Sequence, residues 1–351
     1  MSLESETRRI QLTGGSTLIV SLPKEWARQL NLQPGDEVIL LPQRDMSLLL
    51  VPKKTIRSAF SEAKIEVTDE LAKGDRLTRI TLGYYLAGYD IFRLFFDQNT
   101  IGMKKDIKDI ARRKLTGVEI VDEGRNTLTL QNLINIPGDI SINDIVLKIV
   151  RVTESMLDDI KVALSTIDKN ILMDIVERDN EVDRFYWLLN RMLKKLTTSS
   201  YYASASGIKD PRTILDYALI NKSLERLSDH IVQIANELLQ MGQQYIMGIP
   251  KEQRDKVIEY IDKVMELIGV LSRSLSSQPS GINEINNLID LAREKAKEVR
   301  GLQGSLREYE TSPSIIASFD SILYSIARML EYISDIGEAL LNISIETGQP
   351  G

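Results

Sequence analysis

The sequence predicts a multidomain α+β protein with a small β domain, a small α/β middle domain and an all-α C-terminal part of two tandem three-helix bundles. Three patterns support this prediction: short β-prone runs come first, alternating helices and strands follow, and long helical periodicities fill the rest of the chain. The predicted domain boundaries are 1–54, 55–138 and 139–351, and the two bundles are predicted at 139–248 and 249–351.

Composition limits the classes of protein and site. The 351 residues are 43% hydrophobic and 27% charged, as in an ordinary folded globular protein. No apolar run approaches the roughly eighteen residues of a membrane-spanning helix. The first residues include acids and no apolar core of a secretory signal, so we expect a cytoplasmic protein. The net charge of -6 provides no global attraction to nucleic acid or to an anionic membrane.

Cysteine and histidine usage narrows the chemistry further. The chain has no cysteine, which excludes disulfides, zinc–thiolate sites, iron–sulfur ligation and thiol nucleophiles. It has one histidine, His230, so no site can take two imidazoles from one chain. A Ser-His-Asp triad is disfavoured because His230 lies among polar positions in the middle of a predicted helix. Any metal must therefore be held chiefly by oxygen atoms.

The first domain is predicted to have the order ββαββ. A Gly-rich turn joins the first two strands, and Pro23 suits the first turn of the helix. In chain order, the predicted strands and helix span residues 7–12, 17–22, 23–30, 38–41 and 48–51. A unit of this size buries little core alone, so we expect it to pair with a second copy.

Residues 6–54 resemble the SpoVT/AbrB-type swapped-hairpin DNA-binding domain. The resemblance is carried by Gly15, by Ile19–Glu25 and by Leu32–Val38. It implies an intertwined homodimer whose basic residues contact DNA, here Arg8, Arg9, Lys24 and Arg28. Residues 1–56 contain seven Lys or Arg against six Asp or Glu, so DNA binding requires the basic side chains to gather on one face. The alternative is a domain that only dimerises.

The middle segment alternates helices and strands, which predicts a sheet with helices on one face. The predicted elements span 76–89, 91–96, 104–115, 118–122 and 127–131, and the first and third of these are helices. The second of these helices is the most basic stretch of the chain, with Lys104, Lys105, Lys108, Arg112, Arg113 and Lys114. We interpret it as a solvated helix face; the alternative is a docking surface for nucleic acid, acidic protein or lipid headgroups. Pro137–Asp139 is predicted to be a linker.

The C-terminal part is predicted to be helical throughout. Ser141 and Asp144 form a capping-box pattern at its start. Apolar periodicity then predicts two sets of three helices, at 145–167, 171–196 and 211–241, and at 251–275, 282–306 and 314–345. A loop is expected at 197–210, and Pro211 and Pro313 open the corresponding third helices. Two sets of three helices predict two bundles in tandem.

Four pairs of acidic residues lie four positions apart, so each pair shares one helix face. The pairs are Asp179 with Asp183, Glu225 with Asp229, Glu331 with Asp335, and Glu294 with Glu298. Leu224–Asp229 and Leu330–Asp335 agree at four of six positions, which indicates an internal duplication. Two acids at this spacing weaken a helix by a few tenths of a kcal/mol. We expect this repulsion to be compensated by a metal ion held by the carboxylates or, as the alternative, by nearby basic side chains and water.

Two three-helix halves with acid pairs on their second and third helices resemble the PhoU phosphate-uptake regulator family over residues 140–347. The most specific stretch is Leu224–His230, continuing to Glu237. The resemblance implies multinuclear metal sites on the bundle surface, with iron, manganese, zinc or magnesium as candidates. The implied ligands are Asp179, Asp183, Glu225, Asp229, Glu331 and Asp335. Glu294 and Glu298 depart from the family pattern, because Lys295 and Lys297 oppose a cation there, so we expect weaker binding in the second half.

The fusion of both parts resembles archaeal PhoU-type regulators. The predicted function is therefore the regulation of phosphate uptake and phosphate homeostasis by a homodimer or higher homo-oligomer, with DNA and a phosphate transporter or sensor kinase as candidate partners. The alternative is a DNA-binding transcription regulator whose helices are only an oligomerisation scaffold. Phosphate-dependent derepression of transport in a deletion strain separates the two. No enzyme activity is predicted, because dimetal bundle enzymes use Glu-x-x-His pairs in the core and this chain has one histidine.

Overall fold

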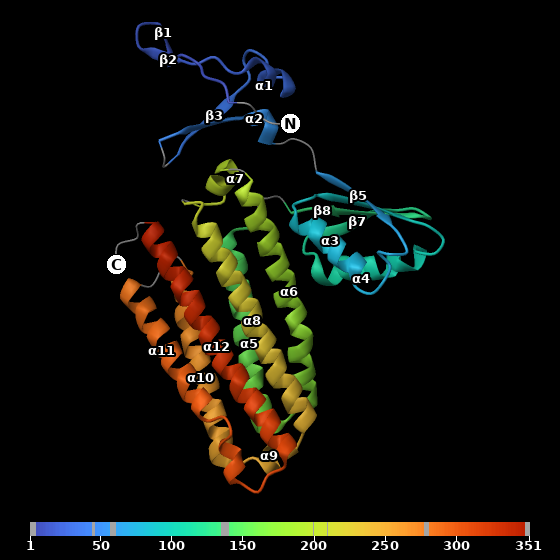
Figure 1. Cartoon of the computed structure of the whole chain (residues 1–351), viewed down its shortest axis with the longest axis vertical. Coiled ribbons are helices and arrows are strands. Elements are labelled where there is room, and N and C mark those ends of the chain that lie inside the picture. The colour runs from blue at the N-terminus through green and yellow to red at the C-terminus, as the bar shows by residue number, and fades with distance from the viewer. Residues whose placement is uncertain are drawn as a thin grey trace. The chain divides into compact units, whose positions relative to one another are not determined.

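The computed structural model describes residues 5–43, 46–56, 61–134, 140–198, 200–208, 210–276 and 281–347. The chain divides into two compact units, residues 1–60 and 61–351, and each is described by itself (Figure 1). The predicted linker at Pro137–Asp139 and the predicted boundary at 138/139 lie outside the described residues. None of the described helices combines the length and the apolar character that a membrane span requires.

The first unit has the predicted ββαββ order; its first two strands are shorter than predicted, and its last two each extend one residue further. It contains the antiparallel hairpin β1 (Gln11–Thr13) and β2 (Thr17–Ile19), helix α1 (Lys24–Gln29), the antiparallel pair β3 (Val38–Pro42) and β4 (Leu48–Pro52), and a short unpredicted helix α2 (Lys53–Ile56). Gly14 and Gly15 turn the first hairpin with φ of 60° and 85°, values that favour glycine.

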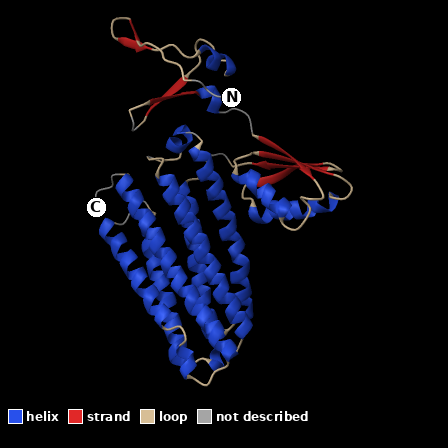
Figure 2. Ribbon diagram, in the orientation of Figure 1, coloured by secondary structure: helices blue, strands red, loops and turns tan. Residues whose placement is uncertain are grey.

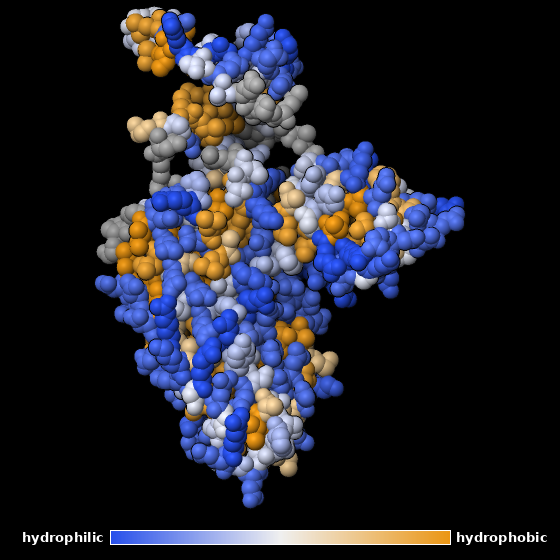
Figure 3. All heavy atoms as spheres, viewed as in Figure 1, coloured by the Kyte–Doolittle hydropathy of each residue, from blue (hydrophilic) through white to orange (hydrophobic). Residues whose placement is uncertain are grey.

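The first unit exposes its apolar side chains. Pro52 is the only buried residue among those described in residues 5–56. Leu12 is 65% exposed, Leu18 67% and Leu40 53%, and Figure 3 shows apolar surface on both hairpins. A chain segment with strands and no buried core needs a second apolar surface to cover it.

The α/β part of the second unit is a four-stranded sheet in the order β5-β6-β8-β7. Its strands are β5 (Glu62–Val67), β6 (Ile91–Phe96), β8 (Thr127–Asn132) and β7 (Val118–Glu123), and β5 and β6 are parallel. Helices α3 (Arg76–Leu86) and α4 (Lys104–Lys114) lie on one side of the sheet, as predicted (Figure 2). Strand β5 was not predicted, although its alternation of exposed and buried residues is regular.

The helical part confirms the six predicted long helices. The first bundle contains α5 (Ile142–Thr166), α6 (Lys169–Thr197) and α8 (Thr213–Met241), and the second contains α10 (Lys251–Ser274), α11 (Ile282–Gly301) and α12 (Pro313–Glu346). Ser141 and Asp144 form the predicted capping box of α5. Two predictions were wrong: short helix α7 (Ser200–Ala205) lies in the predicted loop, and α11 ends at Gly301, before a 3-10 turn at Ser305–Glu308.

The two bundles share one hydrophobic core. Helix α8 packs along α12, and α5 packs on α10, so the long helices run alongside one another (Figure 1). The buried side chains of both bundles form one continuous cluster. The apolar stripe of α8 is buried within it, with Leu224, Leu227, Ile231, Ile234 and Leu238 at most 1% exposed.

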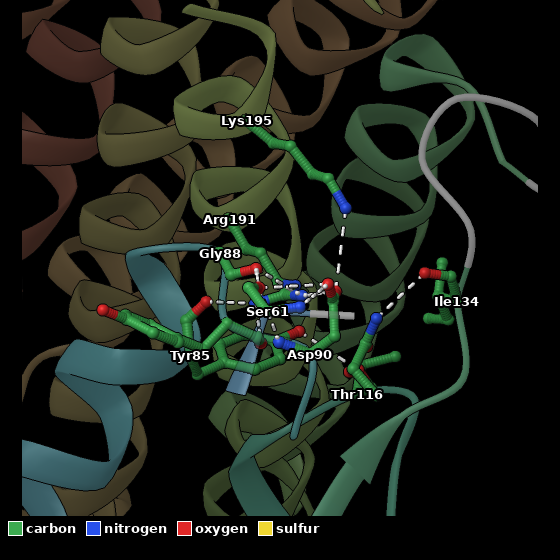
Figure 4. Close-up of polar contacts among 10 residues, drawn as sticks. Ser61, Tyr85, Gly88, Asp90, Thr116, Ile134, Arg191 and Lys195 are labelled. Atoms are coloured by element: carbon green, nitrogen blue, oxygen red, sulfur yellow. Dashed lines mark hydrogen bonds and ion pairs between the residues drawn. The ribbon is translucent and has the colours of Figure 1, made fainter. Parts of the chain in front are cut away.

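A buried arginine attaches the α/β part to the first bundle (Figure 4). Arg191 of α6 is fully buried and donates hydrogen bonds to the carbonyl oxygens of Tyr85 at 2.5 Å, Tyr89 at 2.7 Å and Gly88 at 3.2 Å. Its guanidinium also lies 2.8 Å from Asp90 Oδ1. One side chain therefore binds three carbonyl oxygens and one carboxylate at the turn between α3 and β6. No motif or periodicity in the sequence indicates this role of Arg191.

Candidate metal centre

The fold brings the acid pairs of α6 and α8 together. Asp179 and Asp183 lie one turn apart on α6, and Glu225 and Asp229 lie one turn apart on α8, which packs against α6. Ser228 Oγ donates a hydrogen bond to Asp179 Oδ1 at 2.7 Å, which places the two helices in direct polar contact. We call these four acids the first-half acidic cluster.

The acids of this cluster are not on a fully solvated face. The side chain of Glu225 on α8 is only 14% exposed. Asp229 is 43% exposed, and Asp179 and Asp183 are half-buried. Packing of α6 on α8 partly covers the face of α8 that carries Glu225 and Asp229.

Burial and mutual repulsion disfavour the charged form of three acids in the cluster. Burial raises the pKa of both Asp179 and Asp183, and repulsion by neighbouring carboxylates adds to the effect, although Lys114 opposes it. Burial, with repulsion from Glu225 and Asp179, raises the pKa of Asp229 to about 6.

The basic side chains beside the cluster pair with the acids of α8. Lys222 Nζ lies 2.6 Å from Glu225 Oε2, and Arg226 Nη1 lies 3.5 Å from Asp229 Oδ2. Among the described residues, no Lys or Arg nitrogen forms an ion pair with Asp179 or Asp183. The negative charge of Asp179 and Asp183 on α6 is therefore less compensated than that of Glu225 and Asp229 on α8.

Asp229→Asn is expected to stabilise the metal-free protein at neutral pH and not at acid pH. The pKa of Asp229 is raised from 3.8 to about 6, so the stability linked to its proton is present below the lower value and lost as pH rises to the higher one. Because the side chain is 43% exposed, we expect a gain of only about 1 kcal/mol at neutral pH.

Melting temperatures of wild type and Asp229→Asn, measured with a chelator from about pH 4 to 8, check this expectation. Asp69→Asn is a matched control, since Asp69 is an exposed aspartate outside the cluster. A difference between Asp229→Asn and wild type that stays constant across this pH range would contradict the expectation.

In the second bundle, the first acid of the Glu331/Asp335 pair is bound by arginines. Arg300 of α11 and Arg328 of α12 both pair with Glu331, and Arg300 Nε lies 3.0 Å from Glu331 Oε1. Burial raises the pKa of Asp335, and repulsion from Glu338 adds to it. Two arginines therefore already neutralise Glu331, the acid that corresponds to Glu225.

The fourth pair, Glu294 and Glu298, does not form one cluster with Glu331 and Asp335. Lys295 Nζ lies 2.7 Å from Glu298 Oε1 and 3.7 Å from Glu294 Oε1. Tyr260 of α10 donates a hydrogen bond to Glu298 at 3.4 Å, so Glu298 lies on the α10 side of α11. Lys295, one of the two lysines expected to oppose a cation here, therefore forms ion pairs with both acids.

The donor chemistry of the first-half acidic cluster fits a cation, and its present geometry is not a closed site. All four donors are carboxylates, which suit hard and borderline metal ions. In the described part of the chain, however, no three Asp, Glu or His side chains converge into a metal-holding group. Asp179 would have to turn away from Ser228, and Glu225 from Lys222. Metal binding by the predicted residues therefore stays a prediction.

His230 lies at the junction of the two bundles and not among solvated polar residues. Its Nδ1 is 3.3 Å from Ser325 Oγ of α12, and its ring stacks on Tyr332 with centroids 5.9 Å apart. Burial lowers its pKa to about 4, and the charges of Arg328 and Arg226 add to the effect. The neutral imidazole therefore packs between α8 and α12.

The interpretation of the basic helix as a solvated face is wrong for two of its lysines. Lys104 is buried and donates to the carbonyl oxygens of Gly124 at 2.5 Å and Arg125 at 2.8 Å. Lys108 Nζ lies 2.7 Å from Glu123 Oε1. These lysines hold the β7–β8 turn against α4.

Two of the four predicted DNA contacts are engaged within the first unit. Arg8 pairs with Glu6, and Arg28 Nη1 lies 3.2 Å from Glu25 Oε2. Arg9 and Lys24 are exposed. DNA binding by these residues stays a prediction.

Comparison with known proteins identifies two parts of the chain. The PhoU domain model matches residues 146–238, which span α5, α6 and most of α8 and include the whole first-half acidic cluster. The model of the antidote-toxin recognition protein MazE, a bacterial antitoxin, matches residues 11–58. Among curated proteins, none matches this sequence.

One solved structure matches this chain. It is the crystal structure of the phosphate transport system regulatory protein PhoU from Streptococcus pneumoniae, with 16% sequence identity and a TM-score of 0.48. The similarity covers 60% of this chain and 95% of that one. The family matches show the domain composition: the chain combines a MazE/AbrB-like N-terminal domain with a PhoU domain in its first helical bundle.

Proposed function

We propose that this protein regulates phosphate uptake and phosphate homeostasis, and that the first-half acidic cluster is its metal-binding centre. One observation carries the proposal: the PhoU-domain match falls on the helices whose four carboxylates the fold gathers. The half-burial of these acids and their weakly compensated charge support a bound cation, because a divalent or trivalent ion removes their mutual repulsion.

The proposed ligands are Asp179 and Asp183 of α6 with Glu225 and Asp229 of α8. Iron, manganese, zinc and magnesium all accept carboxylate oxygens, and such an ion would supply the charge that links the two helices. The second half is proposed to bind metal weakly or not at all, since Arg300 and Arg328 already pair with Glu331.

The N-terminal unit is proposed to dimerise. A second copy would cover the exposed leucines of both hairpins, and the paired domain would present Arg8, Arg9, Lys24 and Arg28 to DNA. A phosphate transporter or a sensor kinase is the proposed partner of the helical part. In this arrangement the bundles sense phosphate status and the dimeric unit conveys it.

The double variant Glu225→Ala/Asp229→Ala is expected to lose most of the metal that the wild-type protein carries. Losing two of four ligands leaves Asp179 and Asp183 alone, which is too few donors for tight binding by hard cations. Metal content of protein purified without a metal-chelating tag measures the effect. Glu294→Ala/Glu298→Ala is the control with the same chemical change, and we expect it to retain the metal.

Complementation of a deletion strain tests the regulatory role directly. We expect the deletion to derepress phosphate uptake, wild type to restore control, and Glu225→Ala/Asp229→Ala to fail to restore it. If uptake responds normally to phosphate without the protein, the phosphate role is wrong. Absence of metal from wild type, even after reconstitution with iron or manganese, would contradict the metal-binding role.

A further inference from the structure

Strand β5 forms one open edge of the four-stranded sheet (Figure 1). In the described part of the chain, β6 is the only strand that is hydrogen-bonded to β5. The carbonyl oxygen of Ser61 accepts a hydrogen bond from Ile91 N at 3.0 Å, and alternate residues make such bonds in a parallel pair. The odd-numbered residues of β5 therefore bond to β6. The backbone N–H and C=O groups of Glu62, Lys64 and Glu66 face outward, away from the sheet.

The two edges of the sheet differ in how well they resist pairing with another strand. Strand β7, at the opposite edge, has a bulge between Ile120 and Asp122 and also carries Glu119 and Glu123. Bulges and like charges both hinder the addition of a second strand. Strand β5 contains no proline and pairs with β6 in an unbroken register. Its outer edge is therefore the better site for an added strand.

The exposed charges of β5 favour a partner strand of complementary charge. Ala63, Ile65 and Val67 are buried in the core beneath α3 and α4, so Lys64 and Glu66 stand on the open face of the sheet. Neither of these two side chains forms an ion pair with another described residue. A neighbouring strand that offers an acid opposite the lysine and a base opposite the glutamate would pair both charges.

A second copy of β5, running antiparallel, offers this pattern in one register. When Ile65 lies opposite Ile65 of the second copy, Lys64 of each chain lies opposite Glu66 of the other. The outward backbone groups of these residues then face one another, as a hydrogen-bonded antiparallel pair requires. A register centred on Lys64 would instead place like charges opposite each other, which is destabilising. The axis through Ile65 also keeps the buried faces of both sheets on the same side.

We propose that the β5 edges of two copies pair antiparallel about Ile65 and join the two sheets into one. A single strand pair is small beside the roughly 1,200 Å² that a stable interface buries, so this contact rests on the proposed dimer of the N-terminal unit. That dimer holds two copies at an effective concentration of about millimolar, because α2 ends at Ile56 and β5 begins soon after, at Glu62. The paired edges give the helical bundles, attached to the sheet through Arg191, a fixed symmetric arrangement.

Charge reversal on β5 tests the register. Lys64→Glu brings two acids opposite each other at two symmetric places, so we expect self-association of the full-length protein to weaken about tenfold, and Glu66→Lys should do the same. The double variant Lys64→Glu/Glu66→Lys restores opposite charges and should dimerise within about twofold of wild type. Lys105→Glu, at an exposed lysine of α4, is the control and should not change the dissociation constant. Analytical ultracentrifugation measures these constants, and a double variant as weak as either single variant would overturn the register.

Cysteine cross-linking tests the contact independently of affinity. The chain has no cysteine, so Lys64→Cys/Glu66→Cys introduces the only thiols. Cα atoms of a hydrogen-bonded antiparallel pair lie about 5.5 Å apart, a distance that a disulfide spans. We expect mild oxidation to give a covalent dimer of this variant, and not of Glu119→Cys/Val121→Cys at the β7 edge.

The oligomeric state of the wild type separates the two proposals. A dimeric wild type whose Lys64→Cys/Glu66→Cys variant fails to cross-link would overturn the β5 contact and leave the dimer of the N-terminal unit in place. A monomeric wild type would overturn both.

Discussion

Arg191→Met is expected to lower the free energy of unfolding of the second unit by about 3–5 kcal/mol, the usual cost of removing one partner of a buried ion pair. The substitution leaves the carbonyl oxygens of Tyr85, Gly88 and Tyr89 without this donor. It also leaves Asp90, which is 15% exposed, with Lys195 at 3.7 Å as its remaining cation. Tyr85 O keeps the Gly88 N–H and Gly88 O keeps Ser61 Oγ, so the main losses are the donor to Tyr89 O and the pairing of Asp90, and both favour the unfolded state.

Besides its contact with α6, Asp90 also binds residues at the start of β5 and the end of β8. Its Oδ2 accepts hydrogen bonds from Ser61 N at 3.2 Å and from Ser61 Oγ at 3.1 Å, and its carbonyl oxygen accepts one from Asn132 N at 2.7 Å (Figure 4). The loss of Arg191 should therefore also loosen the start of β5 and the end of β8. Hydrogen exchange is expected to speed up first at these strand ends.

Chemical denaturation, followed by circular dichroism and by hydrogen exchange, measures both effects of Arg191→Met. Arg191→Lys is expected to be intermediate, because an ammonium keeps the charge and cannot reach all four acceptors in the geometry of a guanidinium. Arg151→Met is the control for an exposed arginine on the neighbouring helix α5, where we expect a change within about 0.5 kcal/mol. A loss below about 1 kcal/mol in Arg191→Met would show that the interface does not depend on this side chain.

Leu18→Asp is expected to convert the proposed dimer into a monomer. Leu18 lies on β2, is 67% exposed in one chain, and pairs across the hairpin with Leu12, which is 65% exposed. If a second copy covers this surface, an aspartate there is buried without a partner. The dissociation constant should then rise by at least about a hundredfold, which corresponds to roughly 2.7 kcal/mol.

Light scattering coupled to size exclusion measures the oligomeric state of Leu18→Asp over a range of concentrations. Leu215→Asp makes the same change at a leucine of the second unit that is 75% exposed, and we expect it to leave the dimer intact. Melting of the helical part should not change in either variant, because neither leucine contributes to the shared core. A monomeric wild type would contradict the proposed dimer, and a dimer that survives Leu18→Asp would place self-association elsewhere in the chain.

The sequence determines the local structure of this protein because the relevant patterns are local. Apolar residues at helical spacing predicted all six long helices, and the capping pattern at Ser141 identified the start of α5. Acids four residues apart had to share a helix face, so each of the four pairs was visible before the fold was known. Strand β5 and helix α7 were missed because runs of six residues carry too little periodicity, although the alternation of β5 is regular.

Only the tertiary structure decided which of these pairs meet and what surrounds them. Packing of α6 on α8 brings Asp179 to Ser228 beside Glu225, whereas packing of α11 on α12 brings Arg300 to Glu331. Thr116 and Arg191 gain their partners through the docking of the α/β part, across sequence separations at which no periodicity carries information. Spacing along one helix sets which residues share a face, and the contacts between elements, which depend on the whole core, set whether that face holds free carboxylates or ion pairs.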